Sequence, residues 1–319
     1  MTEDYRSLFV GLEAPVPILN GDSRAYINLD NAASTPSLRA VKKAIDDFLP
    51  YYSSVHRVTG YKSQLSTYAY EEARRLVMGF VGASPSDHVC IFGKNTTEAM
   101  NKLARRFPFT PQRNIVLVSL MEHHSNDLPN RKHFREVVHV PAEATPNSLG
   151  GIDLSRLESE LKARSDRVNY VAITGVSNVT GIVNPIHKIA QLAHQYGALV
   201  VVDAAQMAAH VPIRMSGNTD ASMNLDVLAF SGHKVYAPGS PGVVVARRSL
   251  FSDVEPAEVG GGMVKEVSVD RYTVADHFPD REEAGTPNVS GAIGLAAALY
   301  TLKKIGMENV WVEEDRVLQ

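Results

Sequence analysis

The 319-residue sequence predicts an α/β fold in which a mainly parallel sheet carries helices on both faces. Two observations carry this prediction. Short apolar runs of strand type alternate with segments whose apolar residues recur every three or four positions, as in amphipathic helices. This alternation is typical of parallel strands joined by crossover helices. The composition, 44% hydrophobic and 21% charged, is that of a globular chain long enough for about two domains.

The N-terminal segment is expected to be an irregular arm over residues 1–25, because its prolines and glycines interrupt any periodic pattern. A short strand is predicted over residues 26–29. After a polar turn, Ser37 is the expected cap of a helix that runs toward Phe48 and ends before Pro50.

The next elements alternate in type. Residues 67–80 have apolar side chains at helical spacing and predict a helix that stops at Gly82. A short apolar strand follows over residues 88–92. The polar turn 95–98 then opens a helix that runs through Phe107.

The central part of the chain supplies most of the sheet. A helix is predicted over residues 186–194, closed by Gly197. Strands are predicted over residues 114–119, 137–140, 167–174, 198–203, the apolar run that begins at Leu225, and 242–246.

The end of the chain predicts two consecutive helices. Residues 290–304 form a nearly continuous apolar stretch, typical of a buried helix, and Gly306 stops it. A second helix is expected from Met307 to Gln319. Because no Gly, Asn or Pro closes this helix, we expect the chain to stop in mid-helix, as a truncated or split chain would; a natural short form is the alternative.

Lys234 and Asp203 are the chemically most informative residues. Each directly follows an apolar strand, so both are expected at the same edge of the sheet. Partial burial would lower the pKa of the lysine toward its neutral, nucleophilic form, which attacks aldehydes to give a Schiff base. A carboxylate beside it could keep a pyridine nitrogen protonated. This pair predicts a pyridoxal phosphate site, whereas a lone lysine in this place would more often be solvated.

Hydroxyl, imidazole and backbone N–H groups around this pair fit an anionic phosphate. Ser231 and His233 precede the lysine, and Thr96 and Thr97 lie at the start of a predicted helix, where free N–H groups attract anions. Plain helix capping by Asn95 or Thr96 explains the same turn equally well, and the two interpretations are compatible.

Eight motifs in order resemble those of class V aminotransferase-like enzymes of fold type I, nearest the cysteine desulfurases. The motifs are LDNAASTP at 29–36, VHR at 55–57, NTTE at 95–98, MEHH at 121–124, VSNVTG at 176–181, DAAQ at 203–206, SGHK at 231–234 and EAGTPN at 283–288. The resemblance implies a seven-stranded type of sheet in a large cofactor-binding domain over residues 26–302. It also implies that residues 303–319 begin a smaller C-terminal domain that is incomplete here.

The same resemblance implies roles for individual residues. Asp203 pairs with the pyridine nitrogen of the cofactor, and Gln206 and Asn178 bind its ring hydroxyl. His123 stacks on the ring and relays protons. Thr286 reaches the phosphate of the neighbouring subunit, which implies a homodimer.

Metal and thiol chemistry are not expected. His123 and His124 are adjacent, but a metal site needs ligands spaced by three or four on one helical face or contributed by distant segments. No such set is apparent in the sequence, so no metal site is predicted. The single cysteine, Cys90, lies inside an apolar run and is expected to be structural rather than sulfur-accepting.

The predicted function is that of a pyridoxal phosphate enzyme acting on an amino acid, with cysteine desulfuration or related C–S cleavage favoured. An aminotransferase or epimerase would use the same cofactor site. A non-catalytic or split-chain partner is the alternative from another class, since the family's substrate-binding arginine and catalytic cysteine have no counterpart before Gln319. Arg57 is the nearest matched cation.

The overall charge argues against several partners. A formal net charge of -3 gives no reason to expect nucleic acid or an anionic membrane as a partner. The N-terminus lacks a targeting pattern and no apolar stretch is long enough to span a bilayer, so a cytoplasmic enzyme is expected. An amino acid is the expected substrate, and a sulfur-acceptor protein is a possible partner.

Overall fold

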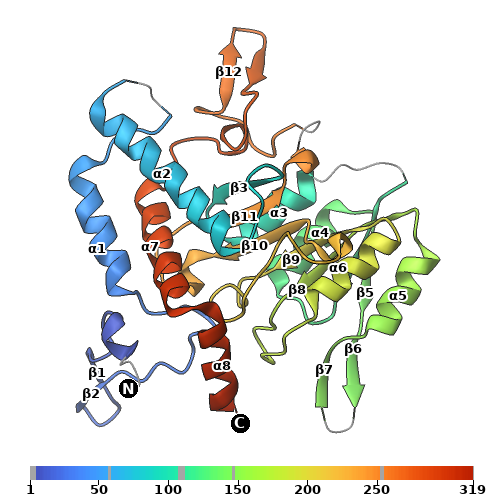
Figure 1. Cartoon of the computed structure of the whole chain (residues 1–319), viewed down its shortest axis with the longest axis horizontal. Helices are drawn as coiled ribbons and strands as arrows, with labels where there is room; N and C mark the ends of the chain where they lie inside the picture. Colours follow the sequence, from blue (N-terminus) through green and yellow to red (C-terminus); the bar gives the residue numbers. More distant parts are fainter. Residues whose placement is uncertain (1–4, 57–58, 107–111, 146–147, 252–254, 319) are drawn as a thin grey trace.

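The structure is a computed structural model that describes residues 5–56, 59–106, 112–145, 148–251 and 255–318. Its centre is a seven-stranded sheet flanked by helices (Figure 1). In the described part of the chain, no helix combines the length and apolar character needed to cross a bilayer.

The sheet has the strand order β3-β11-β10-β9-β8-β4-β5. Strand β11 is antiparallel to both of its neighbours, and the other strand pairs are parallel. The prediction of a mainly parallel sheet is therefore confirmed. The strands are β3 (His88–Gly93), β4 (Ile115–Ser119), β5 (Glu136–Val140), β8 (Val168–Thr174), β9 (Leu199–Asp203), β10 (Val227–Ser231) and β11 (Gly242–Arg247).

Side chains alternate between two apolar layers along each central strand. In β9, Val200 and Val202 belong to one core cluster, whereas Val201 belongs to the other. Both faces of the sheet are thus buried, which explains why these strands read as continuous apolar runs in the sequence.

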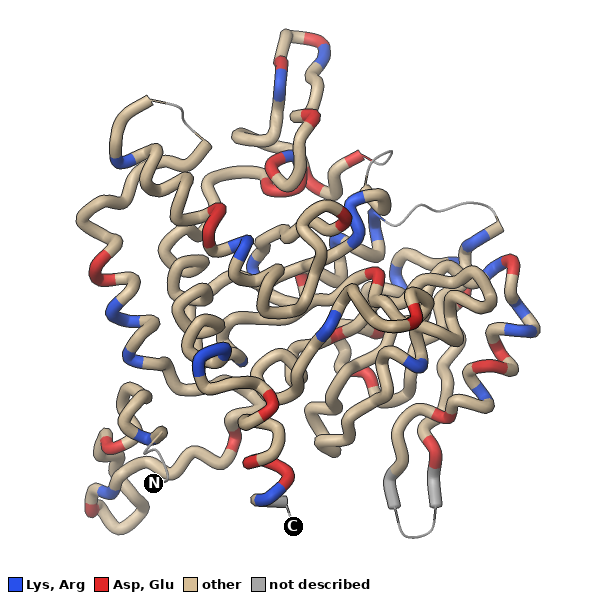
Figure 2. Tube along the Cα trace, viewed as in Figure 1, with Lys and Arg blue, Asp and Glu red and all other residues tan. Residues whose placement is uncertain are grey.

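Helices cover both faces, as predicted. One face packs against α2 (Tyr61–Phe80), α5 (Leu154–Ala163), α6 (Ile186–Gln195) and α7 (Val289–Ile305), and α1 (Arg39–Phe48) lies outside α2 and α7. The other face carries α3 (Thr96–Arg106) and α4 (His124–His133). Lysines and aspartates one turn apart form ion pairs along α1, where blue and red segments follow one another (Figure 2).

The N-terminal predictions need correction. Residues 26–29 do not form a strand; the strand β2 (Ser23–Ala25) lies just before them and pairs with β1 (Pro15–Pro17). The arm is therefore a hairpin preceded by a short helical turn rather than irregular chain. Ser37 does not cap α1, because its hydroxyl donates to the Leu38 carbonyl and Leu38 occupies the cap position without a side-chain bond.

Helix α2 starts six residues earlier than predicted, at Tyr61. Its first turns are held by tertiary contacts: Ser63 Oγ donates to the Ser54 carbonyl at 2.9 Å, and Ser66 Oγ accepts from the Ser53 N–H at 2.9 Å. A pattern of apolar residues cannot report such contacts.

Several elements were not predicted. They are the helices α4 and α5, the hairpin of β6 (Ala142–Thr145) and β7 (Ser148–Ile152), and the hairpin of β12 (Val264–Val267) and β13 (Tyr272–Val274). Helix α4 contains Pro129 and few apolar residues, so it lacks the periodicity that identified the others.

The C-terminal helices agree with the prediction. Helix α7 is capped by the side chain of Asn288, which accepts from the Gly291 N–H at 2.9 Å, and it ends at Gly306 with φ at 89°. Helix α8 (Met307–Leu318) follows directly, and the two successive helices are drawn in red in Figure 1.

Candidate active site

A cavity of about 460 Å³ opens at the carboxyl ends of the parallel strands. This edge is where parallel α/β sheets place their ligands. Apart from Thr286, every site residue predicted from the sequence lines this cavity. The lining consists of Asp30, Ala32, Ala33, Asn95, Thr96, Thr97, His123, Ser125, Thr174, Val176, Asn178, Asp203, Ala205, Gln206, Ser231, His233 and Lys234.

Lys234 lies on a single helical turn that directly follows β10. Its side chain is half-buried, and burial lowers the pKa of its amine, an effect that Asp203 and Asp30 partly oppose. A larger fraction of the amine is therefore neutral at physiological pH than in a solvated lysine. A neutral amine is the form that attacks a carbonyl carbon.

Asp203 ends the neighbouring strand β9 and is 4% exposed. Burial raises the pKa of its carboxyl from 3.8 to about 6, although a hydrogen bond from the Ala205 N–H and the charge of Lys234 both lower it. The carboxylate thus lies in a place where a further cation would stabilise it. A protonated ring nitrogen is such a cation.

Hydrogen bonds from Thr35 hold the main chain on both sides of Lys234. The Thr35 hydroxyl donates to the His233 carbonyl at 2.9 Å and accepts from the Tyr236 N–H at 2.8 Å. The Thr35 N–H donates to the same His233 carbonyl at 3.0 Å. Tyr236 has a positive φ of 59°, a backbone conformation that residues other than glycine rarely adopt. Residues before and after the lysine are therefore both fixed by the distant segment that carries Thr35.

The start of α3 forms another wall of the cavity. Asn95 caps the helix by accepting from the Glu98 N–H at 3.0 Å, and Ser231 Oγ lies 2.8 Å from the Thr96 nitrogen and 2.7 Å from its hydroxyl. A Cβ on Gly242 would lie 2.4 Å from the Asn95 backbone, so only glycine allows β11 to approach this turn. The turn at Asn95 therefore packs directly against β11 at the edge of the cavity.

His123 and Ser125 extend the hydroxyl and imidazole lining. Nδ1 of His123 accepts from the Ser125 N–H at 3.1 Å and lies 2.9 Å from the Ser125 hydroxyl, which is 2.7 Å from that of Thr97. Partial burial and the charge of Lys234 lower the pKa of His123. Its imidazole is therefore neutral near pH 7, as a ring that stacks or relays protons requires.

Glu122 directly precedes His123 and is a residue that the sequence patterns do not single out. Although the residue is only half-buried as a whole, its carboxylate is enclosed, accepting from the Ser119 hydroxyl, from the Thr174 N–H at 2.7 Å and from the Asn126 amide at 2.6 Å. Burial raises its pKa to about 8 in spite of these three donors, and Asp203 adds to the effect. Glu122 thus joins the end of β4 to the end of β8.

The remaining predicted residues lie as follows. Asn178 and Gln206 face the cavity from the loops after β8 and β9, and the Gln206 amide donates to the Ala32 carbonyl at 2.7 Å. Thr286 is exposed and lies outside the cavity. Cys90 is buried in β3, where burial raises the pKa of its thiol. Arg57 falls outside the described residues.

The donor set as a whole combines an amine, a buried carboxylate, two amides, an imidazole and several hydroxyls at one sheet edge. Such a set suits a flat, nitrogen-containing aldehyde that carries a phosphate. The fold and the cavity therefore define an α/β enzyme whose ligand lies at the carboxyl ends of parallel strands.

Comparison with known proteins identifies the family. Residues 27–319 match the sequence profile of the aminotransferase class-V family, and the chain belongs to this family. A cysteine desulfurase of Dickeya dadantii is 36% identical over 317 residues, covering 97% of this chain and 74% of the relative. A probable cysteine desulfurase of Aeropyrum pernix is 37% identical, covering 92% of this chain and 71% of the relative. The chain is a cysteine desulfurase-like enzyme of a family that uses pyridoxal phosphate.

Solved structures agree with this assignment. The apo structure of a cysteine desulfurase from Thermococcus onnurineus superposes with a TM-score of 0.76 at 34% identity, covering 88% of this chain and 68% of that one. The cysteine desulfurase CsdA from Escherichia coli gives a TM-score of 0.75 at 33% identity, covering 88% and 69% of the two chains. The predicted fold type and family are confirmed.

Proposed function

We propose that this protein binds pyridoxal 5'-phosphate covalently through Lys234 and cleaves the C–S bond of L-cysteine. The observation that carries the proposal is the pairing of Lys234 with Asp203 in one cavity. Burial lowers the pKa of the amine and raises that of the carboxyl, so the charged form of each group is less favourable here than in solution. Cysteine as substrate rests on the relatives, which are cysteine desulfurases.

The residues of the cavity fit this cofactor. Asp203 would hold the proton on the ring nitrogen, His123 would cover the ring, and Asn178 and Gln206 would bind its hydroxyl. The phosphate would be held where hydroxyl groups and a helix N-terminus meet, as phosphates often are. The residues at that place are Thr96, Thr97, Ser231 and His233.

When bound, pyridoxal phosphate supplies an aldehyde that takes up the substrate amine and a ring that withdraws electrons from bonds at the α-carbon. Lys234 would move a proton at the substrate α-carbon once its nitrogen is released, and its lowered pKa suits that work. Neutral His123, which also lines the cavity, would hold or pass a proton there. Cys90 has no part in this scheme, because it is buried in the sheet.

The protein would work as a homodimer in the cytoplasm. Thr286 is exposed outside its own cavity, which leaves its hydroxyl available to the phosphate of a neighbouring subunit. Sulfur would leave on a thiol other than that of Cys90, which is enclosed, such as a thiol of an acceptor protein. Light scattering tests the oligomer, and a monomer with full cofactor affinity would contradict the shared site.

Borohydride reduction tests the covalent attachment. The cofactor-loaded protein is reduced, digested and mapped by mass spectrometry, with Lys188→Ala as the control for an exposed lysine elsewhere. We expect a pyridoxyl group on the peptide that contains Lys234 in the wild type and in the control. An adduct on another lysine, or none in saturated protein, would refute the proposal.

A second assay tests the substrate. Alanine and sulfide release are measured with L-cysteine as substrate and with an added dithiol, which reduces the sulfur removed from cysteine to sulfide, beside amino-group transfer to a 2-oxo acid. Alanine and sulfide in equal amounts support desulfuration. Transfer of the amino group without sulfide would instead identify an aminotransferase that uses the same residues.

A further inference from the structure

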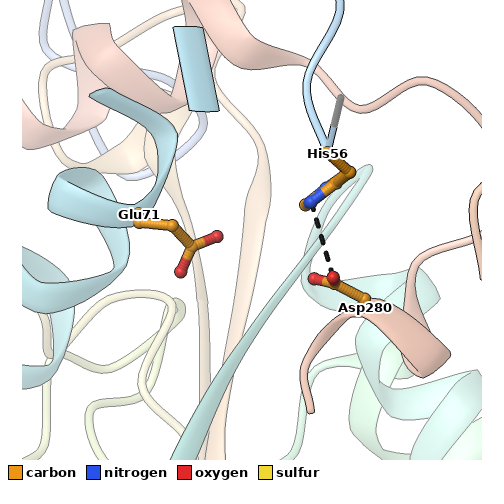
Figure 3. A group of neighbouring side chains, drawn as sticks. All are labelled: His56, Glu71 and Asp280. Carbon is orange, nitrogen blue, oxygen red and sulfur yellow. Dashed lines mark ion pairs between the residues drawn. The ribbon is translucent and has the colours of Figure 1, made fainter. Parts of the chain in front are cut away.

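A cluster of metal-ligating side chains lies outside the active site. His56, Glu71 and Asp280 come from three separate segments, and each offers a ligand atom within 4.8 Å of the other two (Figure 3). His56 follows the apolar Val55, Glu71 projects from the middle of α2, and Asp280 begins a short helical turn after β13. The three side chains are only partly exposed and point toward a common space.

We propose that His56, Glu71 and Asp280 bind a first-row transition-metal dication, with Zn²⁺ as the best match. One imidazole nitrogen with two carboxylates suits Zn²⁺ or Mn²⁺, whereas Mg²⁺ prefers oxygen ligands alone. The site is separate from the cofactor cavity, which contains none of the three residues. The inference therefore stands apart from the proposed function.

The geometry already approaches that of a bound ion. In a tetrahedral Zn²⁺ site, bonds of about 2.0–2.2 Å place neighbouring ligand atoms about 3.4 Å apart. His56 Nδ1 and Asp280 Oδ2 are 3.5 Å apart, which matches one edge of such a tetrahedron. Glu71 completes the set by a rotation of its side chain, because all three ligand atoms are within 4.8 Å of one another.

The surrounding charges favour a cation. Arg74 is the basic residue in contact with Glu71, at 3.1 Å, but its guanidinium is bound on its other side by both oxygens of Glu283, at 2.7 and 2.8 Å. Arg74 and Glu283 therefore offset each other. Glu71 and Asp280 thus bring two carboxylates to one histidine, a combination that attracts a cation.

The ligands also have outer partners that would orient them. His277 Nε2 lies 2.7 Å from Asp280 Oδ2, and the backbone N–H of His56 donates to the Thr67 hydroxyl at 3.1 Å, which fixes the main chain that carries the imidazole. Hydrogen bonds to the residues that bind a metal are a regular feature of metal sites, because they fix the direction of each ligand. A bound ion would tie α2 to the segment that leads from Asp280 to Thr286.

This proposal differs from the expectation of no metal for a physical reason. The sequence shows no set of distant ligands because their contact arises only in the fold, and these three ligands span more than half of the chain. Ligands from distant segments leave no periodic signature in the sequence.

Metal titration of the full cofactor-loaded protein tests the proposal. The tag-free protein is freed of metal with a chelator and titrated calorimetrically with Zn²⁺, and then with Mg²⁺. We expect one equivalent of Zn²⁺ to bind much more tightly than Mg²⁺. His56→Gln, Glu71→Gln and Asp280→Asn should each weaken Zn²⁺ binding at least about tenfold. Co²⁺ in place of Zn²⁺ should give the visible absorption of a low-coordinate site, lost in the same variants.

Matched controls separate this site from general effects of charge. Glu72→Gln removes the next carboxylate on α2, which pairs with Arg75, and Asp276→Asn removes an exposed carboxylate that pairs with Lys265. Both should bind Zn²⁺ as the wild type does. Should His56→Gln fail to fold, Glu71→Gln still decides, because that side chain is 39% exposed. Unchanged Zn²⁺ binding by Glu71→Gln and Asp280→Asn, or no binding by the wild type, would overturn the proposal.

Discussion

An aspartate is buried at the carboxyl ends of the central strands and another at their amino ends. The two differ in how many partners the chain gives to the carboxylate. Asp203 ends β9 at the carboxyl edge and is 4% exposed, while Asp226 precedes β10 at the amino edge and is 1% exposed. Asp226 has contacts on both oxygens: His194 at 2.8 Å and the Val200 N–H at 2.7 Å on one, Arg247 at 2.9 Å on the other.

Within the described residues, the Asp203 carboxylate accepts one hydrogen bond, from the Ala205 N–H at 2.9 Å, and burial raises its pKa. The amino edge therefore holds a carboxylate whose partners are supplied by the chain itself. The carboxyl edge holds one whose missing partner a ligand can supply. Burying a charge without its partner is unfavourable, and such a feature is expected where binding is the purpose.

Replacing Lys234 should produce the largest effect, and the effect should be on turnover far more than on the free energy of unfolding. Lys234→Ala removes the amine that holds the cofactor and moves the proton, so we expect at least about a thousandfold loss of turnover with L-cysteine. The free energy of unfolding of the cofactor-free protein should fall by only about 1 kcal/mol or less, because the lysine is half-buried and its charge only partly stabilises the Asp203 carboxylate. Lys188→Ala, at an exposed position, should leave it nearly unchanged. Rates come from sulfide release and stability from denaturant unfolding. Substantial turnover by Lys234→Ala would remove the basis of the account.

Replacing Asp226 should affect stability instead. Asp226→Asn keeps an acceptor for the Val200 N–H but leaves Arg247 and His194 without their carboxylate, at a cost on the order of 2–3 kcal/mol. The hydrogen bond with Asp226 raises the pKa of His194. The contribution of this pair is therefore complete below the ordinary histidine pKa and is lost as pH rises through the raised value.

The loss caused by Asp226→Asn should accordingly be greater at about pH 5.5 than at about pH 8.5, two values on either side of the histidine range. Cofactor affinity should remain that of the wild type. A variant that loses cofactor while keeping its stability would reverse the roles assigned to the two edges.

Replacing Thr35 should have a smaller effect, on both the stability of the protein and the environment of Lys234. Thr35→Val removes the hydroxyl that bridges the His233 carbonyl and the Tyr236 N–H, and an unpaired buried N–H costs about 1–3 kcal/mol. We also expect the pH at which the bond between cofactor and lysine titrates to move, which is measured from its absorption spectrum. Thr35→Ser keeps the hydroxyl and should restore both values. Loss of stability without any spectral shift would mean that Thr35 has no part in positioning Lys234.

The sheet could be predicted from the sequence because both of its faces are buried. Each central strand is a continuous apolar run, so strands such as β8 and β9 were found within one or two residues. Helix α4 could not be found in this way. It is stabilised by polar contacts, among them the cap at His123 and the hydrogen bond between Asn126 and Glu122.

The site could be predicted where a residue stands at a strand end or a helix start. Lys234, Asp203 and Thr96 all have such positions, and all of them line the cavity. Thr35 could not be found, because its role depends on contacts with residues about 200 positions away. Glu122 was missed for a related reason, since its carboxylate joins two strands that are distant in sequence.

The pH dependence of stability in Asp203→Asn tests the central claim most directly. The folded-state pKa of Asp203 is raised from 3.8 to about 6, so the folded protein binds this proton more tightly, and its stability falls as pH rises through that range. At pH 7 the buried charge costs on the order of 3 kcal/mol. Asparagine avoids this cost while keeping an acceptor for the Ala205 N–H.

Unfolding of the cofactor-free protein is therefore compared between wild type and Asp203→Asn from acid to neutral pH. We predict that the variant gains stability relative to the wild type as pH rises through about 6, and that saturating pyridoxal phosphate reverses the order because only the wild type binds it well. A variant less stable than the wild type at neutral pH without cofactor would contradict the claim that Asp203 is a buried carboxylate whose charge only the ligand compensates.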